Sequence, residues 1–334
     1  MTSSRVLIRA LQILLLAAVA WGIYRVLAAE FAQVSLADLL RFRPRALPLL
    51  LSFILLVGVY VAHAFLWRRI MRDLAIGQAS ARATLRVYFL AGLGRYLPGK
   101  LWQLAGLALL ARRAGLPPGA ATAAALLGQF GFLTTGLLFL GLTLPEWRAA
   151  FGGNAADATV GPLALGTALL VTGGAALWIT VATPLGHGLR ERTARLLGRR
   201  AGEKITAAFA LADRVRATDA ISWAAGYALT WVMLGAAFVL FTAAFVPGVG
   251  AAPRFVAGTV AASYLAGYLF LLVPAGLGVR ETAMVLLLQR VLPEPGAALV
   301  VSVLSRVWFT AAELVPLAFV PALRADVVVG EEEA

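Results

Sequence analysis

Cysteine is absent from this chain of 334 residues, and histidine occurs only twice, as His63 and His187. The absence of cysteine excludes disulfides, thiolate metal sites and a cysteine nucleophile. Two histidines far apart in the sequence argue against a histidine-based metal site or a Ser-His-Asp triad. We therefore expect no metal, no cofactor and no catalytic residue, and we expect His63 to be a packing residue.

Charged residues are also scarce. They make up 13% of the chain, whereas hydrophobic residues make up 61% and the mean hydropathy is +0.87. Soluble domains contain about 25% charged and about 45–50% apolar residues. The composition therefore predicts an all-α polytopic membrane protein.

Acidic residues number only 16, against 29 lysines and arginines, which gives a formal net charge of +13. In a soluble protein this excess would favour nucleic acid as a partner, but here the basic residues cluster between apolar runs. Loop orientation and anionic lipid headgroups explain the excess better, so we expect lipid partners and no nucleic acid. The Ala-, Arg- and Gly-rich, Lys-poor composition is typical of a GC-rich bacterium, which predicts location in the inner (cell) membrane.

Six apolar runs are long enough to cross a bilayer, which requires about 20 residues. Two further stretches, near 83–113 and 255–291, are each split by proline and glycine into two short helices. We predict re-entrant hairpins there, because a broken helix at membrane depth must be buried in protein or line water. For the first stretch, a pair of interfacial amphipathic helices is the alternative. The six spans are 11–29, 46–67, 120–144, 162–183, 223–246 and 296–321.

An internal repeat divides the chain into halves 1–150 and 151–334. Pro98-Gly99 and the string Leu-Pro-Pro-Gly-Ala-Ala at 116–121 recur 176–177 residues later, as Pro274-Ala-Gly276 and Leu-Pro-Glu-Pro-Gly-Ala-Ala at 292–298. Three crossings per half would make the two repeats inverted, as in many secondary transporters.

This topology places both termini and the basic segment 185–220 in the cytoplasm, and residues 145–160 outside. Arg41, Arg43 and Arg45 would then also lie outside, against the positive-inside rule. Segment 185–220 is interpreted either as amphipathic helices on an anionic membrane surface or as a solvated linker. The stripe of Trp223, Tyr227 and Trp231 is expected to be packing or an interfacial belt.

Polar residues inside the last span mark a candidate site. Ser302, Arg306, Thr310 and Glu313 recur at spacings of 4, 4 and 3 and therefore share one helical face, which must face the bundle or a cavity. An intrahelical Arg306–Glu313 pair that only holds helices together is the alternative. Gln129 corresponds to Arg306 in the repeat. A second charged pair, Arg280-Glu281, follows the break at 274–278, and snorkelling of this pair at a helix end is the alternative to a buried site.

The two broken stretches carry the strings Arg95-Tyr-Leu-Pro98-Gly99-Lys100-Leu-Trp102-Gln103 and Pro274-Ala-Gly276-Leu-Gly278-Val-Arg280-Glu281. Together they resemble the membrane region of lysylphosphatidylglycerol synthases, which also occurs as stand-alone, flippase-like membrane proteins. The resemblance covers nearly the whole chain, with Ala275 where the family often has a second glycine. Because the chain ends at Ala334, we expect the soluble aminoacyl-tRNA-dependent transferase of the bifunctional members to be absent. The resemblance implies movement of a lipid rather than its synthesis.

A mechanism follows from helices that restart after the two breaks. Such helix ends present free N–H groups and positive dipole ends to an anion, here beside Lys100 and Arg280. We predict that an anionic phospholipid or a lipid-linked substrate passes its headgroup through a polar cavity between the halves. No GxxxxGK[ST] motif appears, so direct ATP hydrolysis is not expected. The predicted lipid-binding residues are Arg95, Pro98, Gly99, Lys100, Trp102, Gln103, Gln129, Pro274, Gly276, Gly278, Arg280, Glu281, Arg306 and Glu313.

Two other classes of protein compete with this interpretation. A membrane-embedded lipid-phosphate transferase or phosphatase would use Glu281 or Glu313 as a base, with Arg280 and Arg306 as charge stabilisers. No HExxH, DxxD or paired-carboxylate pattern supports it. A non-transporting scaffold would instead use segment 185–220 as a docking surface. The sequence predicts neither the lipid, nor the direction of movement, nor the oligomeric state.

Overall fold

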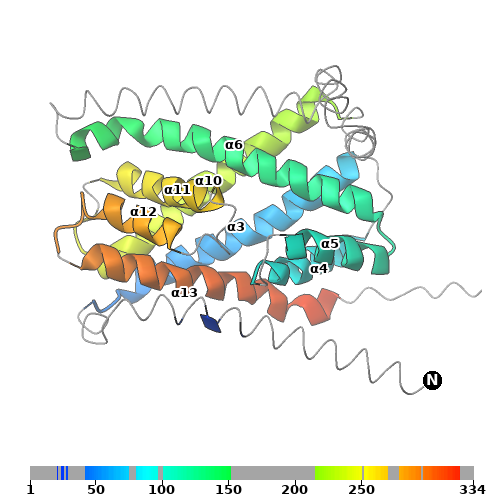
Figure 1. Ribbon diagram of the computed structural model, residues 1–334, viewed down its shortest axis with the longest axis horizontal. Helices are drawn as coiled ribbons and strands as arrows, with labels where there is room; N and C mark the ends of the chain where they lie inside the picture. The colour runs from blue at the N-terminus through cyan, green and yellow to red at the C-terminus, as the bar shows by residue number, and fades with distance from the viewer. Residues whose placement is uncertain are drawn as a thin grey trace, which may run out of the picture.

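The computed structural model describes residues 42–74, 80–96, 101–151, 215–249, 252–269, 278–294 and 296–323, together with residues 21, 24, 25 and 28. All regular elements in these ranges are helices, which confirms the all-α prediction for this part of the chain (Figure 1). The elements are α3 (Ala46–Asp73), α4 (Ala81–Gly92), η1 (Leu93–Tyr96), α5 (Leu101–Arg113), α6 (Pro118–Phe151), α10 (Ala217–Phe245), α11 (Pro253–Leu269), α12 (Val279–Leu288), α13 (Ala297–Ala318) and η6 (Val320–Leu323).

Four of these helices, α3, α6, α10 and α13, are long and apolar enough to cross a membrane. They confirm four of the six expected spans. The other two, 11–29 and 162–183, lie outside the described residues, apart from the isolated positions in the first. Most of the basic segment 185–220 lies outside them as well.

Two helices continue beyond the C-terminal ends expected from hydropathy, and α10 begins at Ala217 instead of residue 223, so it takes in the last residues of segment 185–220. Helix α3 runs to Asp73 instead of residue 67, and Asp73 accepts a 2.8 Å hydrogen bond from Nε1 of Trp223. Helix α6 runs to Phe151 instead of residue 144, so Glu146 belongs to a helix and not to a connection. Glu146 accepts the backbone N–H of Phe255 at 3.1 Å and pairs with Arg254. In both cases a polar contact to another helix stabilises turns that apolar content alone does not predict.

Helices α3 and α10 pack antiparallel against each other. At one end, the backbone N–H of Arg45 donates to the carbonyl of Ala244 at 2.8 Å, and the guanidinium donates to the carbonyl of Ala243. At the other end, the Asp73–Trp223 bond joins the end of α3 to the beginning of α10. The two helices are therefore joined at both ends of the pair.

Aromatic side chains and small residues fill the space between the helices. Trp223, Tyr227 and Trp231 are buried, so the aromatic stripe is packing and not an interfacial belt. Trp231 stacks on Phe132 with ring centroids 4.4 Å apart and donates its indole N–H to the carbonyl of Phe132 at 2.7 Å. A Cβ at Gly136 would lie 2.5 Å from the Trp231 ring, so only glycine admits this contact.

His63 also packs against this core, as expected. Its Nε2 lies 3.0 Å from Oγ1 of Thr230, and its ring meets Phe132 edge-on at 4.7 Å.

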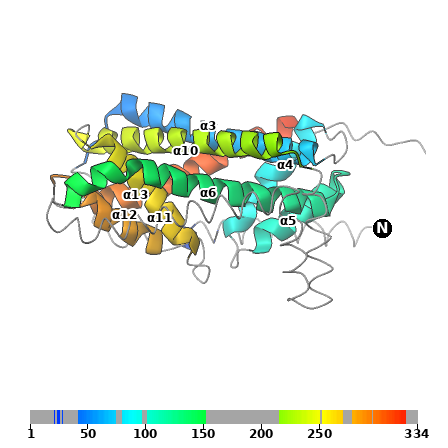
Figure 2. The ribbon, with the colours of Figure 1, turned by 90° about the horizontal axis from the view of Figure 1, so that it is seen from above.

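In each of the two interrupted stretches, the described residues form separate helices on either side of the proline and glycine cluster. The first consists of α4, η1 and α5, and we call it hairpin 1. The second consists of α11 and α12, and we call it hairpin 2. Hairpin 1 and hairpin 2 lie toward opposite ends of the bundle in both views (Figures 1 and 2). Residues 97–100 and 270–277, which form most of the two breaks, lie outside the described residues.

Candidate functional site

The polar stripe of α13 faces the interior of the bundle. Ser302 is fully buried, and Arg306 and Thr310 are 7% and 8% exposed. The stripe does not contain the intrahelical Arg306–Glu313 pair that the sequence offered as an alternative. Instead, Arg306 pairs with Glu281 of hairpin 2, and Glu313 pairs with Arg95 of hairpin 1.

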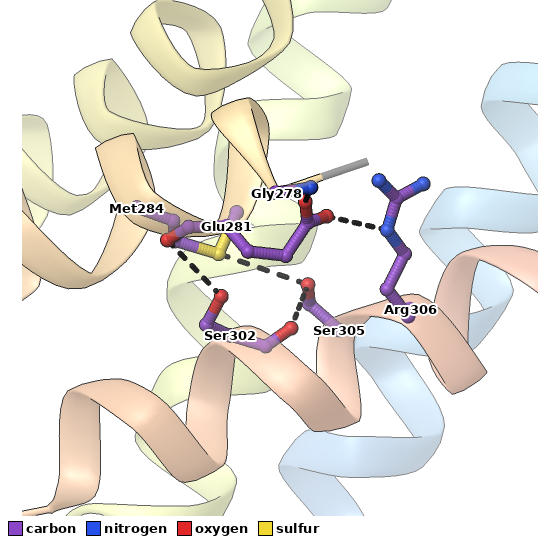
Figure 3. Close-up of polar contacts among 6 residues, drawn as sticks. All are labelled: Gly278, Glu281, Met284, Ser302, Ser305 and Arg306. Carbon is purple, nitrogen blue, oxygen red and sulfur yellow. Dashed lines mark hydrogen bonds and ion pairs between the residues drawn. The ribbon is translucent and has the colours of Figure 1, made fainter. Parts of the chain in front are cut away.

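Glu281 joins the beginning of α12 to α13 (Figure 3). Its Oε1 accepts a hydrogen bond from Nε of Arg306, and its Oε2 accepts the backbone N–H of Gly278 at 2.8 Å. Gly278 caps α12 with φ +80°, a conformation that side chains disfavour. Ser302 and Ser305 of α13 add contacts to the carbonyl of Glu281 and to the sulfur of Met284.

This geometry changes the expectation of free N–H groups at the restart of α12 for one of them. The N–H of Gly278 is occupied by the carboxylate of Glu281 itself, three residues further along the chain. Glu281 is also the partner of Arg306 and not of its neighbour Arg280. The reason is geometric, because consecutive residues on a helix point about 100° apart.

Glu313 receives three donors from the first half of the chain. Nη1 of Arg95 lies 2.6 Å from its Oε1, and the hydroxyl of Tyr60 donates to the same oxygen at 2.8 Å. The hydroxyl of Tyr96 donates to Oε2 at 2.5 Å. Sequence reasoning missed both tyrosines. Tyr96 stands inside the Arg95–Gln103 string, whereas Tyr60 is marked only by a hydroxyl within an apolar span.

A small cavity adjoins Glu313. Its volume is ≈ 30 Å³, enough for one or two water molecules. It is lined by Tyr60, Tyr88, Phe89, Gly92, Leu93, Arg95, Tyr96, Glu313, Leu314 and Leu317.

Arg280 differs from the other two arginines of the site. Its side chain is buried, with 8% of the residue exposed, and its guanidinium carbon lies 4.0 Å from the centroid of the Phe309 ring. Nε and Nη2 have no hydrogen-bond partner among the residues that the structure describes. Because Arg280 and Glu281 are 8% and 5% exposed, the snorkelling alternative is wrong.

The charges of this interior do not balance. Two ion pairs are present, Arg95–Glu313 and Arg306–Glu281. The positive charge of Arg280 has no matching carboxylate among the described residues. Tyr264 of α11 lies within electrostatic range of both Arg95 and Arg280, so the two pairs and Arg280 belong to one connected region. Within the described residues this region carries a net charge of +1.

The structure does not place the other predicted lipid-binding residues among these charged side chains. Gln129 lies in α6 with its Nε2 buried and without a hydrogen-bond partner in the described part of the chain. Trp102 is 55% exposed on α5, and Gln103 beside it is half-buried. Pro98, Gly99, Lys100, Pro274 and Gly276 lie outside the described residues. Over the described ranges no group of three histidine, aspartate or glutamate side chains is placed to hold a metal ion.

Long apolar helices around a charged interior define a multi-pass helical membrane protein. The chain belongs to the family described as the lysylphosphatidylglycerol synthase TM region, whose family model matches residues 7–312. The resemblance inferred from the two strings is thereby confirmed, and a role connected with membrane lipids follows at the level of the family. No curated protein and no solved structure gives a significant match.

Proposed function

We propose that this protein moves an anionic lipid between the leaflets of the cell membrane. The headgroup would pass through the charged interior while the acyl chains stay in the bilayer. In this proposal the chain has six spans and two re-entrant hairpins, arranged as inverted repeats with both termini in the cytoplasm. The antiparallel packing of α3 and α10 and the placement of the hairpins toward opposite ends support the arrangement.

The observation that carries the proposal is the unmatched charge of Arg280. On insertion scales an arginine at the centre of a span costs about 2.5–3.5 kcal/mol, and leaving a buried charge without its partner costs about 3–5 kcal/mol. A phosphate would offset this cost, since an arginine binds its oxygens through two parallel N–H donors.

Phe309 prepares Arg280 for such a ligand. The aromatic ring stabilises the flat face of the guanidinium, a contact typically worth about 0.5–2 kcal/mol. The N–H groups, which lie in the guanidinium plane, remain available to an anion. A surplus of one positive charge suits one phosphodiester group, which carries a single negative charge.

The test is lipid movement in proteoliposomes that contain fluorescent phosphatidylglycerol, read as the fraction of lipid quenched by an impermeant reductant. We expect wild-type protein to expose inner-leaflet lipid and Arg280→Gln to abolish this movement while inserting normally. Arg254→Gln is the matched control, because Arg254 lies on α11 with a side chain that is 70% exposed. Full movement with Arg280→Gln would contradict the proposed site.

The same vesicles separate the competing functions. Mass spectrometry of the lipids before and after incubation should show no new species, because the proposal includes no chemical change. A changed lipid mass would indicate a transferase or phosphatase instead. Unchanged mass without movement would indicate a scaffold.

A further inference from the structure

Glu281 and Glu313 differ in their surroundings although both pair with an arginine. Glu281 has a side chain that is 7% exposed and holds the N–H of Gly278, and it does not line the cavity. Glu313 has a side chain that is 17% exposed and lies at the wall of the cavity. The carboxylate of Glu281 is therefore buried at the start of α12, whereas that of Glu313 adjoins a cavity large enough for water.

We propose that Glu313 is a proton-binding site, and that its protonation releases Arg95 and couples lipid movement to a pH difference across the membrane. The coupling rests on the proposed function for its cargo. The proton site itself can be tested without any lipid movement. The sequence contains no ATP-binding motif that would supply energy in another way.

The position of Glu313 suits a coupling ion. It lies 16 residues from Ala297, the start of the apolar span that ends at Ala322, or about 24 Å along the helix. Ionisable groups inside spans commonly serve ion pathways and proton relays. The donors to Glu313 come from α3 and η1 of the first half, whereas Glu313 belongs to the second half. The ionised carboxylate therefore holds the two halves together.

Protonation reverses the chemistry of this contact. An ionised carboxylate accepts hydrogen bonds at both oxygens, whereas a protonated one carries an O–H donor. Arg95 can only donate, so a neutral Glu313 loses both the charge attraction and one acceptor position. The contact is then a two-state element whose equilibrium is set by a proton.

Among the described residues, the ionisable groups that face Glu313 are four tyrosines and one arginine. They are Tyr60 from α3, Tyr88 from α4, Arg95 and Tyr96 from η1, and Tyr264 from α11. Tyrosine and arginine ordinarily titrate at pH 10 and above. Glu313 is therefore the one carboxylate among them. His63 of α3 lies within electrostatic range of Arg95, and a comparison of Glu313 with Glu313→Gln holds its contribution constant.

Proton binding also favours the binding of an anion. When Glu313 is neutral, Arg95 becomes a second unmatched cation and the net charge of the described interior rises from +1 to +2. By linkage, the anionic headgroup then favours proton binding to the same extent. A proton and a lipid monoanion would cross together without net charge movement.

We call the contact between Arg95 and Glu313 the latch, and the first experiment measures its opening directly. Leu93 lines the cavity and the sequence has no cysteine, so Leu93→Cys is a single reporter. Its maleimide labelling rate is compared between the Glu313 and Glu313→Gln backgrounds from pH 5 to 8, and the ratio cancels the pH dependence of the thiol. We expect labelling to be severalfold faster with Gln at pH 8, and the ratio of the two rates to fall as the pH is lowered. A ratio that does not change with pH overturns the proton site.

A second variant guards against misfolding of Glu313→Gln. Tyr96→Phe keeps the carboxylate and removes one donor to its ionised form. We expect the pH at which the latch opens to move upward. A purely structural Tyr96 would lower the melting temperature without moving that pH, and that result also counts against the proposal.

The second experiment imposes a pH difference across the proteoliposomes described above. Wild-type movement should accelerate severalfold when the side from which lipid leaves is acidic, and Glu313→Gln should not respond. Glu146→Gln should keep the wild-type response, because that carboxylate pairs with Arg254 at the end of α6. Lipid movement that ignores the pH difference overturns the coupling and leaves the proposed function standing. Absence of any movement refutes the proposed function, and the latch assay alone then decides on Glu313.

Discussion

Arg306 and Glu313 share one face of α13 two turns apart, yet each forms its ion pair with a different hairpin. Arg306 binds Glu281 at the start of α12, and Glu313 binds Arg95 in η1. The two pairs are about 10 Å apart along the helix axis. The last span therefore contacts both hairpins, at α12 and at η1.

The Glu281–Arg306 pair should be essential for stability. Glu281→Gln leaves a buried guanidinium without its partner and weakens the cap on Gly278, so we expect a loss of about 3–5 kcal/mol. Thermal melting in detergent measures this loss, and Glu281→Gln with Arg306→Gln should recover part of it. Glu146→Gln, which breaks a more exposed pair, should cost about 1 kcal/mol or less. Equal costs for the two single variants would contradict this role.

Gly278 should tolerate no side chain, and for a backbone reason alone. A Cβ there meets no atom within 4 Å, but the φ of +80° is strained for any other residue. We expect Gly278→Ala to destabilise the protein by about 1–2 kcal/mol. Gly106→Ala in the interior of α5 is the matched control, since a Cβ there also meets open space and alanine favours helices by about 0.5–1 kcal/mol. Opposite shifts in melting temperature are the expected result.

Gly136 should also tolerate no side chain, but because of a steric clash and not because of backbone strain. Its Cβ would lie 2.5 Å from the ring of Trp231 in the centre of the bundle. We expect Gly136→Ala to cost about 1–3 kcal/mol through overpacking, measured by melting. Gly136→Ala combined with Trp231→Phe, which provides space, should be more stable than Gly136→Ala with an intact Trp231. If the double variant is no better, the clash is not the cause.

The inverted arrangement makes a prediction about accessibility. Arg113 ends α5 and Gln289 follows α12, and both side chains are exposed. With an impermeant maleimide, Gln289→Cys should be labelled in intact cells and Arg113→Cys only after permeabilisation. Labelling of both residues from the same side would rule out inverted repeats.

Sequence reasoning predicted what depends on one element at a time. The four described spans follow from hydropathy, the separate helices of both hairpins follow from proline and glycine, and the buried face of α13 follows from helical spacing. The partners within the ion pairs could not be predicted from the sequence, because they depend on how the helices pack against one another. Tyr60 reaches Glu313 only because α3 lies against α13. Glu281 pairs with Arg306 and not with its sequence neighbour Arg280 because α12 lies against α13. The extra turns of α3 and α6 depend on Trp223 and Arg254, which belong to the second half of the chain.

The fastening of α3 to α10 at both ends limits how this protein can change shape. With Arg45 bound to the end of α10 and Asp73 bound to its beginning, neither helix can slide along the other without breaking both contacts. A shear between the two halves is thereby disfavoured. For the proposed transport we therefore expect the interior to open by rotation of the hairpins and α13 around α3 and α10, whose relative position along their axes stays fixed.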